Sequence, residues 1–237
     1  MSIIRDNGIL LKEIQRGEND KQLTILTLES GKITVFAKGA KRPKSKFAAA
    51  QALIYSEFVI FNGGRFLSLN QINPLLGFPS IAENYDKYCT ACIFMEICDN
   101  LLLPEMDSRK GLKILLHSLK ALSNPDCVHS PPLVFAVFVF KFLQSEGFAP
   151  LLDYNENGDF AFFSAEGLTP FAPNSQTVTL SKCAVSALKY ILDADIKSLF
   201  CFRVSEDVAK SLGIAAGIFL KNNIDVKINS LELIPWI

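Results

Sequence analysis

Residues 22–47 read QLTILTLESGKITVFAKGAKRPKSKF, and this stretch decides the fold of the N-terminal third of the chain. The β-branched and apolar residues of 22–29 and 32–37 predict two strands, and Ser30-Gly31 predicts a tight hairpin turn between them. The remaining part, the basic loop (residues 38–47), has five cationic and no acidic side chains. Gly39 and Pro43 disfavour both helix and strand there. We therefore expect a mobile cationic loop that leaves the end of a strand and contributes little to a core.

Three more strands are predicted around this hairpin, at residues 3–14, 53–61 and 65–72. Asn7-Gly8 predicts a bulge or bend in the first of them, and Asn62-Gly63-Gly64 is a strong hairpin signal between the last two. Five strands joined mostly by short turns within residues 1–78 fit a small closed Greek-key barrel such as an OB-fold.

The pattern becomes helical from Ser80 onward. A capping box of Ser80 and Glu83 is expected to begin the first helix, and the helix at 133–145 is apolar almost all round, which predicts the buried centre of a helical domain. The helices expected in all are 80–103, 108–122, 133–145, 181–192, 196–202 and 205–222. Residues 151–175 are predicted as an irregular insertion with a hairpin, and 225–237 as a tail with one strand-like run. The fold class expected is α+β, with domains at 1–78 and 79–237.

Charge is distributed unevenly although the net charge of the 237 residues is zero. Residues 1–78 hold eleven Lys and Arg against six Asp and Glu, so this part carries +5 and the remainder −5. Such asymmetry predicts an anion-binding N-terminal module. Mean hydropathy is +0.26, but the most apolar run, 133–143, is far shorter than the roughly 20 residues of a membrane-spanning helix. With no apolar signal segment near Met1, we expect a cytoplasmic protein without a membrane partner.

Nothing in the sequence supports catalysis or a cofactor. His117 and His129 are the only histidines and lie outside any triad pattern, and no phosphate-binding glycine loop or His-Glu-x-x-His motif occurs. Cys89 and Cys92 have the spacing of half a metal site, but a second pair is missing, so small core residues are the better interpretation. We expect no enzyme, no metal and no cofactor. The other cysteines are Cys98, Cys127, Cys183 and Cys201, all expected to be reduced.

Nucleic-acid binding has positive support. Barrels of this type bind strands in a groove of cations and aromatic rings, and contacts to phosphates alone predict binding without sequence specificity. The cations expected to contact phosphates are Lys38, Lys41, Arg42, Lys44 and Lys46, extended by Arg16, Lys21 and Arg65. Phe36, Phe47 and Phe66 are candidate stacking platforms, of which we expect about one in three to contact a base. An OB-type RNA-binding protein and, with less support, a nuclease are the alternatives.

Several motifs in order along the chain resemble one family. They are GENDK at 17–21 with LTILT at 23–27, Gly31-Lys32, AKGAKRPKSKF at 37–47, Phe142-Leu143 with GFAPL at 147–151, and KINSL at 227–231. Together they resemble the bacterial recombination mediators of the RecO family. The resemblance implies an N-terminal OB-fold, a helical C-terminal domain and no enzymatic activity. It also implies a nucleoid-associated protein that acts in DNA repair and homologous recombination.

The partners that the resemblance implies are single- and double-stranded DNA, the protein RecR, the C-terminal tail of the single-strand-binding protein (SSB), and RecA indirectly. Such proteins anneal complementary strands and help RecA load onto SSB-coated DNA. The acidic, hydrophobic SSB tail needs an apolar pocket beside a cation, for which Lys113, Lys120 and Lys141 are candidates. Many family members carry a four-cysteine zinc site after the central helix, but this chain has no cysteine between Cys127 and Cys183, so we expect no zinc here.

Overall fold

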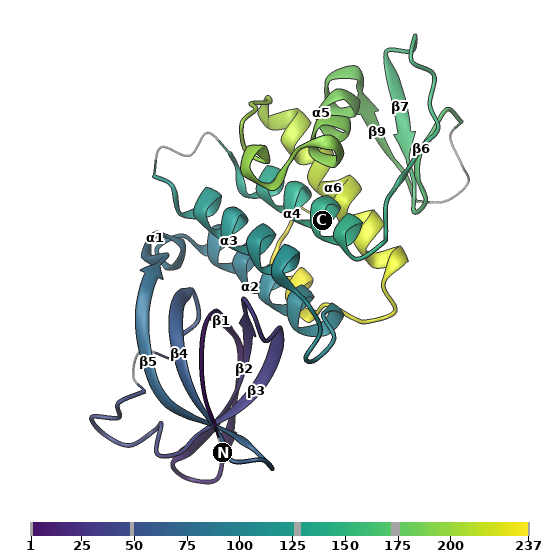
Figure 1. The fold of residues 1–237 in the computed structure, drawn as a ribbon. Helices are drawn as coiled ribbons and strands as arrows, with labels where there is room; N and C mark the ends of the chain where they lie inside the picture. The colour runs from purple at the N-terminus through teal and green to yellow at the C-terminus, as the bar shows by residue number, and fades with distance from the viewer. Residues whose placement is uncertain (1, 48–49, 126–128, 172–175, 237) are drawn as a thin grey trace. The chain divides into compact units, whose positions relative to one another are not determined.

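The computed structural model describes residues 2–47, 50–125, 129–171 and 176–236, and it divides into two compact units. Unit 1 contains the chain up to Pro79 together with Phe94–Lys113, and unit 2 contains Ser80–Ile93 and the chain from Ile114 onward (Figure 1). The division between the units therefore passes through two helices. Helix α2 (Tyr85–Leu101) and helix α3 (Arg109–Ser123) each contribute residues to both units.

Unit 1 is built on five strands that close into a barrel in the order β1-β2-β3-β5-β4. Their bounds are β1 Ser2–Arg16, β2 Asp20–Thr27, β3 Lys32–Ala37, β4 Ile54–Asn62 and β5 Leu67–Gly77. Neighbouring strands are antiparallel except β3 and β5, which pair in parallel at Val35–Leu67 and Phe36–Ser68. The five-stranded barrel followed by helices and a small sheet confirms the predicted α+β fold with an N-terminal OB-fold.

Strand β1 changes partner near Gly8, as its Asn7-Gly8 pair suggested. Residues before this point pair with β4, and those after it pair with β2. A Cβ on Gly8 would lie 2.4 Å from the carbonyl oxygen of Leu26, so only glycine fits where the two sheets meet. A register shift between Leu10 and Lys12 adds a bulge just beyond the change of partner.

The barrel core consists of inward-facing residues from all five strands, and it includes two residues that the sequence interpretation left outside. Leu23, Ile25, Val35 and Ile60 are fully buried. Phe47 and Ala50 join the same cluster with 5% and 6% exposure, although they follow the basic loop. The expectation that this loop contributes little to a core is therefore wrong at its end. A buried phenylalanine anchors the last residue of the loop in the barrel.

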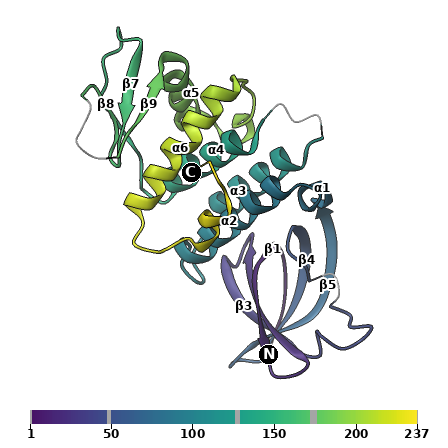
Figure 2. The same ribbon diagram turned by 180° about the vertical axis from the view of Figure 1, so that it is seen from behind.

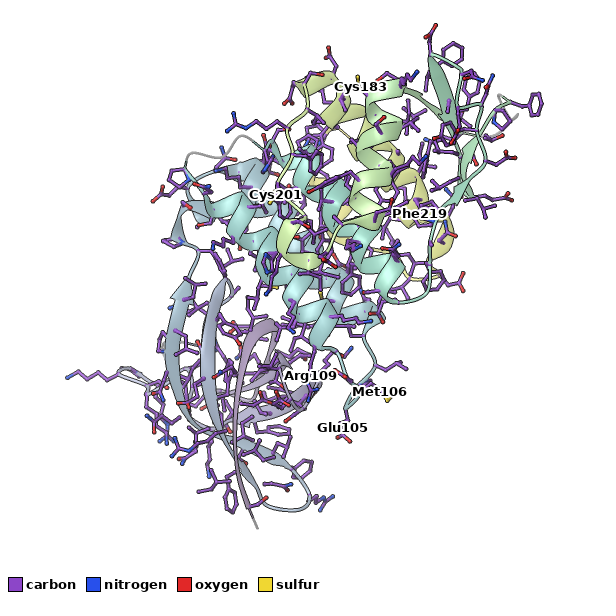
Figure 3. The ribbon with its side chains drawn as sticks, turned by 45° about the horizontal axis from the view of Figure 1, so that its top comes forward. Glu105, Met106, Arg109, Cys183, Cys201 and Phe219 are labelled. Atoms are coloured by element: carbon purple, nitrogen blue, oxygen red, sulfur yellow. The ribbon has the colours of Figure 1, made fainter. Side chains whose placement is uncertain are left out.

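The turn between β2 and β3 contacts the segment that joins α2 to α3, and both belong to unit 1. The backbone amide of Glu105 donates to the carbonyl of Lys32 at 3.1 Å, and Arg109 pairs with the Glu29 carboxylate at 2.5 Å. From the barrel side, the Asp6 carboxylate accepts the amide of Ser30 at 2.8 Å. Figure 3 labels Glu105, Met106 and Arg109 on this segment. The hairpin turn is thus held on two sides.

Helix α4 (Pro131–Ser145) is the centre of unit 2, as predicted, because ten consecutive residues from Leu133 to Phe142 include only one, Lys141, that is not buried. Phe140 of α4 meets Phe163 edge-on at 5.6 Å, and Phe163 meets Phe219 at 6.2 Å. Phe219, labelled in Figure 3, lies on α6 (Glu206–Asn223). Helix α5 (Lys182–Asp193) completes the bundle; Ser181 and Ser205 cap α5 and α6, accepting the amides of Ala184 and Val208.

Three predicted elements of unit 2 are wrong. The helix expected from residue 80 to 103 is two helices, α1 (Pro79–Ala82) and α2, because Asn84 interrupts it and caps α2 by accepting the amide of Lys87 at 3.0 Å. Ser80 forms no capping box: its hydroxyl donates to the carbonyl of Ser123 at 2.6 Å. The helix expected at 196–202 is a short 3₁₀ turn, η1 (Ile196–Ser198), and the described part of the tail from residue 225 contains a 3₁₀ turn, η2 (Asn229–Leu233), in place of the expected strand-like run.

The insertion after α4 forms a four-stranded sheet rather than a single hairpin. Its strands are β6 (Leu151–Leu152), β7 (Phe160–Phe163), β8 (Gly167–Thr169) and β9 (Val178–Ser181), in the order β6-β8-β7-β9 (Figure 2). Side chains alternate across it. The inner face, with Ala161, Phe163, Leu168 and Leu180, is 0–2% exposed. The outer face carries Phe160 and Phe162, whose rings meet edge-on at 5.6 Å.

Candidate nucleic-acid interface

Three loops gather at one end of the barrel, at the bottom of Figure 1. They are residues 17–19, the basic loop (38–47) and residues 63–66, and we call this region the basic end. The amide of Lys41 donates to the carbonyl of Asn19 at 3.0 Å, which ties the first two loops together. The rings of Phe36 and Phe66 meet edge-on at 5.5 Å, which ties the third loop to β3. The first two loops therefore form one surface, while the third lies along β3, where Arg65 and Phe66 line a pocket with Ser30 and Ile33.

The basic loop has a hydrogen-bonded course, whereas the sequence predicts a mobile one. The amide of Gly39 donates to Asp20 Oδ1 at 2.7 Å, the amide of Arg42 donates to the carbonyl of Gly39 at 3.1 Å, and the amide of Ser45 donates to the carbonyl of Arg42 at 3.0 Å. Gly39 has φ +73°, a left-handed conformation that glycine adopts without strain. These backbone bonds hold the loop in place, while its Phe47 side chain packs into the barrel core.

All five loop cations are exposed, and none is in an ion pair with another described residue: Lys38, Lys41, Arg42, Lys44 and Lys46. Lys46 alone among them has a side-chain partner in the barrel, since it donates to Asn70 Oδ1 at 3.5 Å and lies 5.1 Å from the centroid of the Phe47 ring. Exposed cations without an ion-pair partner are available to an incoming anion. The loop therefore concentrates positive charge that the fold itself does not use.

The three cations predicted outside the loop differ in their surroundings. Arg65 lies 5.3 Å from the centroid of the Phe66 ring and borders the same surface. Arg16 donates to Gln22 Oε1 at 2.9 Å, so it keeps its charge. Lys21 pairs with Glu13 Oε2 at 2.7 Å, and the nearby carboxylate offsets part of its charge. Arg65 is thus better placed than Lys21 to extend the basic loop.

The structure separates the three candidate stacking residues. Phe66 is 55% exposed, Phe36 is half-buried against it, and Phe47 is 5% exposed in the core. Only an exposed ring face can stack on a base, so Phe66 remains the candidate and Phe47 has a packing role. A cationic surface with one exposed ring can bind phosphates and stack on a base, and no base-reading helix lies among its contributing elements.

A second candidate site lies in unit 2, in a cavity of about 640 Å³ that we call the cationic cavity. Its charged and titratable lining residues are His117, Lys120, His129, Lys197 and Arg203, with no carboxylate among the described lining residues. Phe200 and Phe202 supply apolar walls, and the His129 ring lies 5.6 Å from Phe200. Burial, and then the charge of Lys120, lower the pKa of His117.

Of the three lysines proposed for the SSB tail, only Lys120 lines this cavity. Lys113 is exposed on α3 outside the lining. Lys141 Nζ donates to the carbonyl of Leu192 at 2.7 Å, and burial lowers its pKa. The sequence interpretation missed Lys197, Phe200, Phe202 and Arg203. The run Phe-Cys-Phe-Arg at 200–203 is a weak sequence signal for a binding site. Its position beside α3 depends on tertiary packing, which the sequence pattern does not show.

The structure gives two further results on metals and membranes. Among the described residues, no three His, Cys, Asp or Glu side chains gather as metal ligands. The insertion contains no cysteine from residue 151 to 181, so its residues do not fit a four-cysteine zinc site. Of the helices in the described part, none has the length and apolar character needed to cross a membrane.

Two family models match this chain almost end to end. "Recombination protein O N terminal" matches residues 1–78, and "Recombination protein O C terminal" matches residues 82–232. The chain belongs to the RecO family. Among RecO relatives, DNA repair protein RecO of Acetivibrio thermocellus is 30% identical over 245 residues, covering 99% of this chain and 97% of the relative. DNA repair protein RecO of Caldicellulosiruptor saccharolyticus is 27% identical over 246 residues, covering 100% of both. Family membership places this chain among DNA repair and recombination proteins.

Proposed function

We propose that this protein is a non-catalytic recombination mediator that binds single- and double-stranded DNA without sequence specificity and anneals complementary strands. The observation that supports this most directly is the basic end of the barrel, where Lys38, Lys41, Arg42 and Lys44 are exposed without ion pairs among the described residues. Each neutralised phosphate releases counterions, so a surface of this kind binds any sequence and binds less tightly as salt rises.

Annealing follows from the same electrostatics. Two DNA strands repel each other through their phosphates, and a cationic surface that screens this repulsion lets complementary bases meet. The backbone hydrogen bonds of the loop hold these cations in place, so that they do not all turn toward a single DNA strand. Phe66, beside Arg65, stacks on an unpaired base and favours single strands over duplex.

The cationic cavity is our proposed site for the C-terminal tail of SSB. An acidic, hydrophobic peptide matches a cavity with Lys120, Lys197 and Arg203 around Phe200 and Phe202. Holding the tail there brings SSB-coated DNA to the protein. With RecR, the protein then assists RecA loading. We place the domain boundary near residue 78, between a barrel that binds DNA and a helical domain that binds partner proteins.

Strand annealing with and without SSB tests the proposal. The purified protein is mixed with two complementary fluorescent oligonucleotides, and duplex formation is followed over time. Acceleration that persists on SSB-coated strands is expected, and equal rates with and without the protein on naked strands would refute annealing. Competition with RNA of the same sequence separates DNA from RNA preference. Incubation of labelled DNA with Mg²⁺ tests for nuclease activity, and cleavage would refute the non-catalytic role.

A further inference from the structure

The outer face of the insertion sheet carries large apolar side chains beside the polar Thr169, Thr179 and Ser181, which pair with its phenylalanines. Antiparallel sheets that cover a core on one side normally carry polar side chains on the other. Here β7 places Phe160, 56% exposed, and the half-buried Phe162 on the outer face. Leu151, on β6, is 60% exposed and lies on the same face, because its neighbour Leu152 pairs with the inner-face Leu168. Exposed apolar side chains clustered on one small sheet are typical of an interaction surface.

The charge around this sheet has one sign. The sequence between Lys141 and Lys182 contains no Lys or Arg but contains five acidic residues. Four of them are exposed within the sheet and its loops: Asp153, Glu156, Asp159 and Glu166. Glu156 lies 3.7 Å from Lys189, which offsets part of its charge, and the other three have no ion pair among the described residues. The acidic charge rules out DNA as the occupant, because phosphates would be repelled.

We propose that this outer face docks the basic loop of a second copy of the chain. The loop is the charge complement of the face: between Glu29 and Glu57 the sequence has six cations and no acidic residue. A guanidinium or ammonium group over a phenylalanine ring is attracted by the ring's negative face, so Arg42 of one copy pairs with Phe160 of the other. The flanking carboxylates then face Lys38, Lys41 and Lys44.

A single contact between two different surfaces is head-to-tail and leaves one loop and one face unpaired in each pair of copies. Association through it continues into a ring or an open chain of copies as concentration rises, unless both loops dock reciprocally in one dimer. It should also be weakened by salt, because both surfaces are exposed and the Debye length falls to about 8 Å at physiological ionic strength. One consequence rests on the proposed function: docked loops cannot bind DNA, so DNA and self-association compete for the same cations.

Sedimentation velocity of the protein without DNA tests the docking, so the result does not depend on DNA binding. At about 20 mM salt, where screening is weak, the weight-average mass should rise with concentration, and at about 500 mM it should return to one chain. Two charge reversals probe the contact: Asp153→Lys with Asp159→Lys and Glu166→Lys on the face, and Lys38→Glu with Lys41→Glu and Arg42→Glu on the loop. Each alone should abolish association.

Mixing the two reversed variants brings the unaltered loop of the face variant together with the unaltered face of the loop variant. The 1:1 mixture should therefore associate again, whereas each variant alone lacks this pair of surfaces. A matched control reverses Glu83, Asp195 and Asp225 to Lys, the same change in net charge away from the sheet, and should still associate. Phe160→Ser, at an exposed position, should weaken association at least threefold. Circular dichroism confirms that each variant is folded.

Several results would overturn the proposal. The wild-type protein could sediment with the mass of one chain at low salt, or neither charge reversal could change its association. The matched control could lose association as fully as the reversed variants, or the mixture of the two reversed variants could remain monomeric. The last result would assign the charge effect to contacts within one chain.

Discussion

The backbone amide of Gly39 donates a 2.7 Å hydrogen bond to Asp20 Oδ1, so a carboxylate at the start of β2 fixes the first turn of the basic loop. An acidic residue beside a phosphate-binding loop weakens anion binding, yet here it orders the residues that carry the cations. Substitutions of Asp20 should therefore separate the effect of this hydrogen bond on the order of the loop from the effect of the carboxylate charge on anion binding.

Asp20→Ala should lower the free energy of unfolding by about 1–2 kcal/mol, the effect of leaving a donor without its partner. Asp20→Asn keeps the acceptor oxygen and removes the charge, so it is the matched control and should lose less. Hydrogen exchange at the Gly39 amide should accelerate in Asp20→Ala only. Equal exchange rates in the two variants would show that the bond does not order the loop.

Replacing Lys41, Arg42, Lys44 and Lys46 by Ala should weaken DNA binding and flatten its salt dependence. Each lost phosphate contact reduces the slope of log K against log [salt] by roughly 0.7–0.9, so the slope should fall by about 3 if all four cations contact phosphates. Fluorescence anisotropy with one oligonucleotide over a salt series measures it. Replacing Lys110, Lys182, Lys210 and Lys221 by Ala removes the same charge elsewhere. An unchanged slope in the loop variant, or equal changes in both, would contradict the loop's role.

Phe66→Ala and Phe47→Ala should separate binding from stability. Phe66 is 55% exposed, so its loss should leave the fold stable but reduce single-strand affinity by about 1–3 kcal/mol, the usual contribution of one stacked base. Phe47 is 5% exposed, so its loss should destabilise the barrel by roughly 3–5 kcal/mol. Urea unfolding and single-strand binding are measured on both. A stable Phe66→Ala variant with wild-type affinity would remove Phe66 from the interface.

The sequence predicts the barrel well because its signals are local. Alternation predicts β3 at the residues observed, 32–37, and Asn62-Gly63-Gly64 predicts the β4–β5 turn. It predicts the unit 2 sites poorly because these depend on packing. Lys141 lies on an apolar helix, so it looked like a pocket cation, but its ammonium group donates a hydrogen bond to the backbone carbonyl of Leu192 on α5. Phe47 resembled a stacking ring because nothing in a basic run indicates that its last residue enters a core.

Purified protein should contain much less than one zinc per chain. The insertion has no cysteine from residue 151 to 181, and the described cysteines, which form no disulfide with one another, lie elsewhere in the two units: Cys89, Cys92, Cys98, Cys183 and Cys201. Cys127 lies outside the described residues. Mass spectrometry of metals after dialysis against zinc, with and without chelator, measures the content. The melting temperature should not change on chelation. Stoichiometric zinc that survives dialysis, or a lower melting temperature with chelator, would refute this prediction.

Binding of an acidic peptide to the cationic cavity should strengthen as the pH falls through the titration of His117. Burial, and then Lys120, lower the pKa of this histidine below its ordinary value of about 6.5. Without peptide, the unfolded state therefore binds the proton more readily, and the His117 contribution to stability is present above that value and lost as the pH falls below it. A bound carboxylate reverses the preference, because it favours imidazolium, so binding takes up a proton.

A synthetic peptide with the acidic, hydrophobic end of the SSB tail should bind several-fold more tightly at pH 5.5 than at pH 7.5, as measured by isothermal titration calorimetry. The His117→Gln variant should show a weaker pH dependence of peptide binding. Lys120→Glu should weaken binding at every pH, whereas Lys113→Glu, on the same helix outside the lining, is the matched control. Lys141→Glu is a poor probe, because it would place a carboxylate against the Leu192 carbonyl. Equal losses in the Lys120 and Lys113 variants would place the peptide elsewhere.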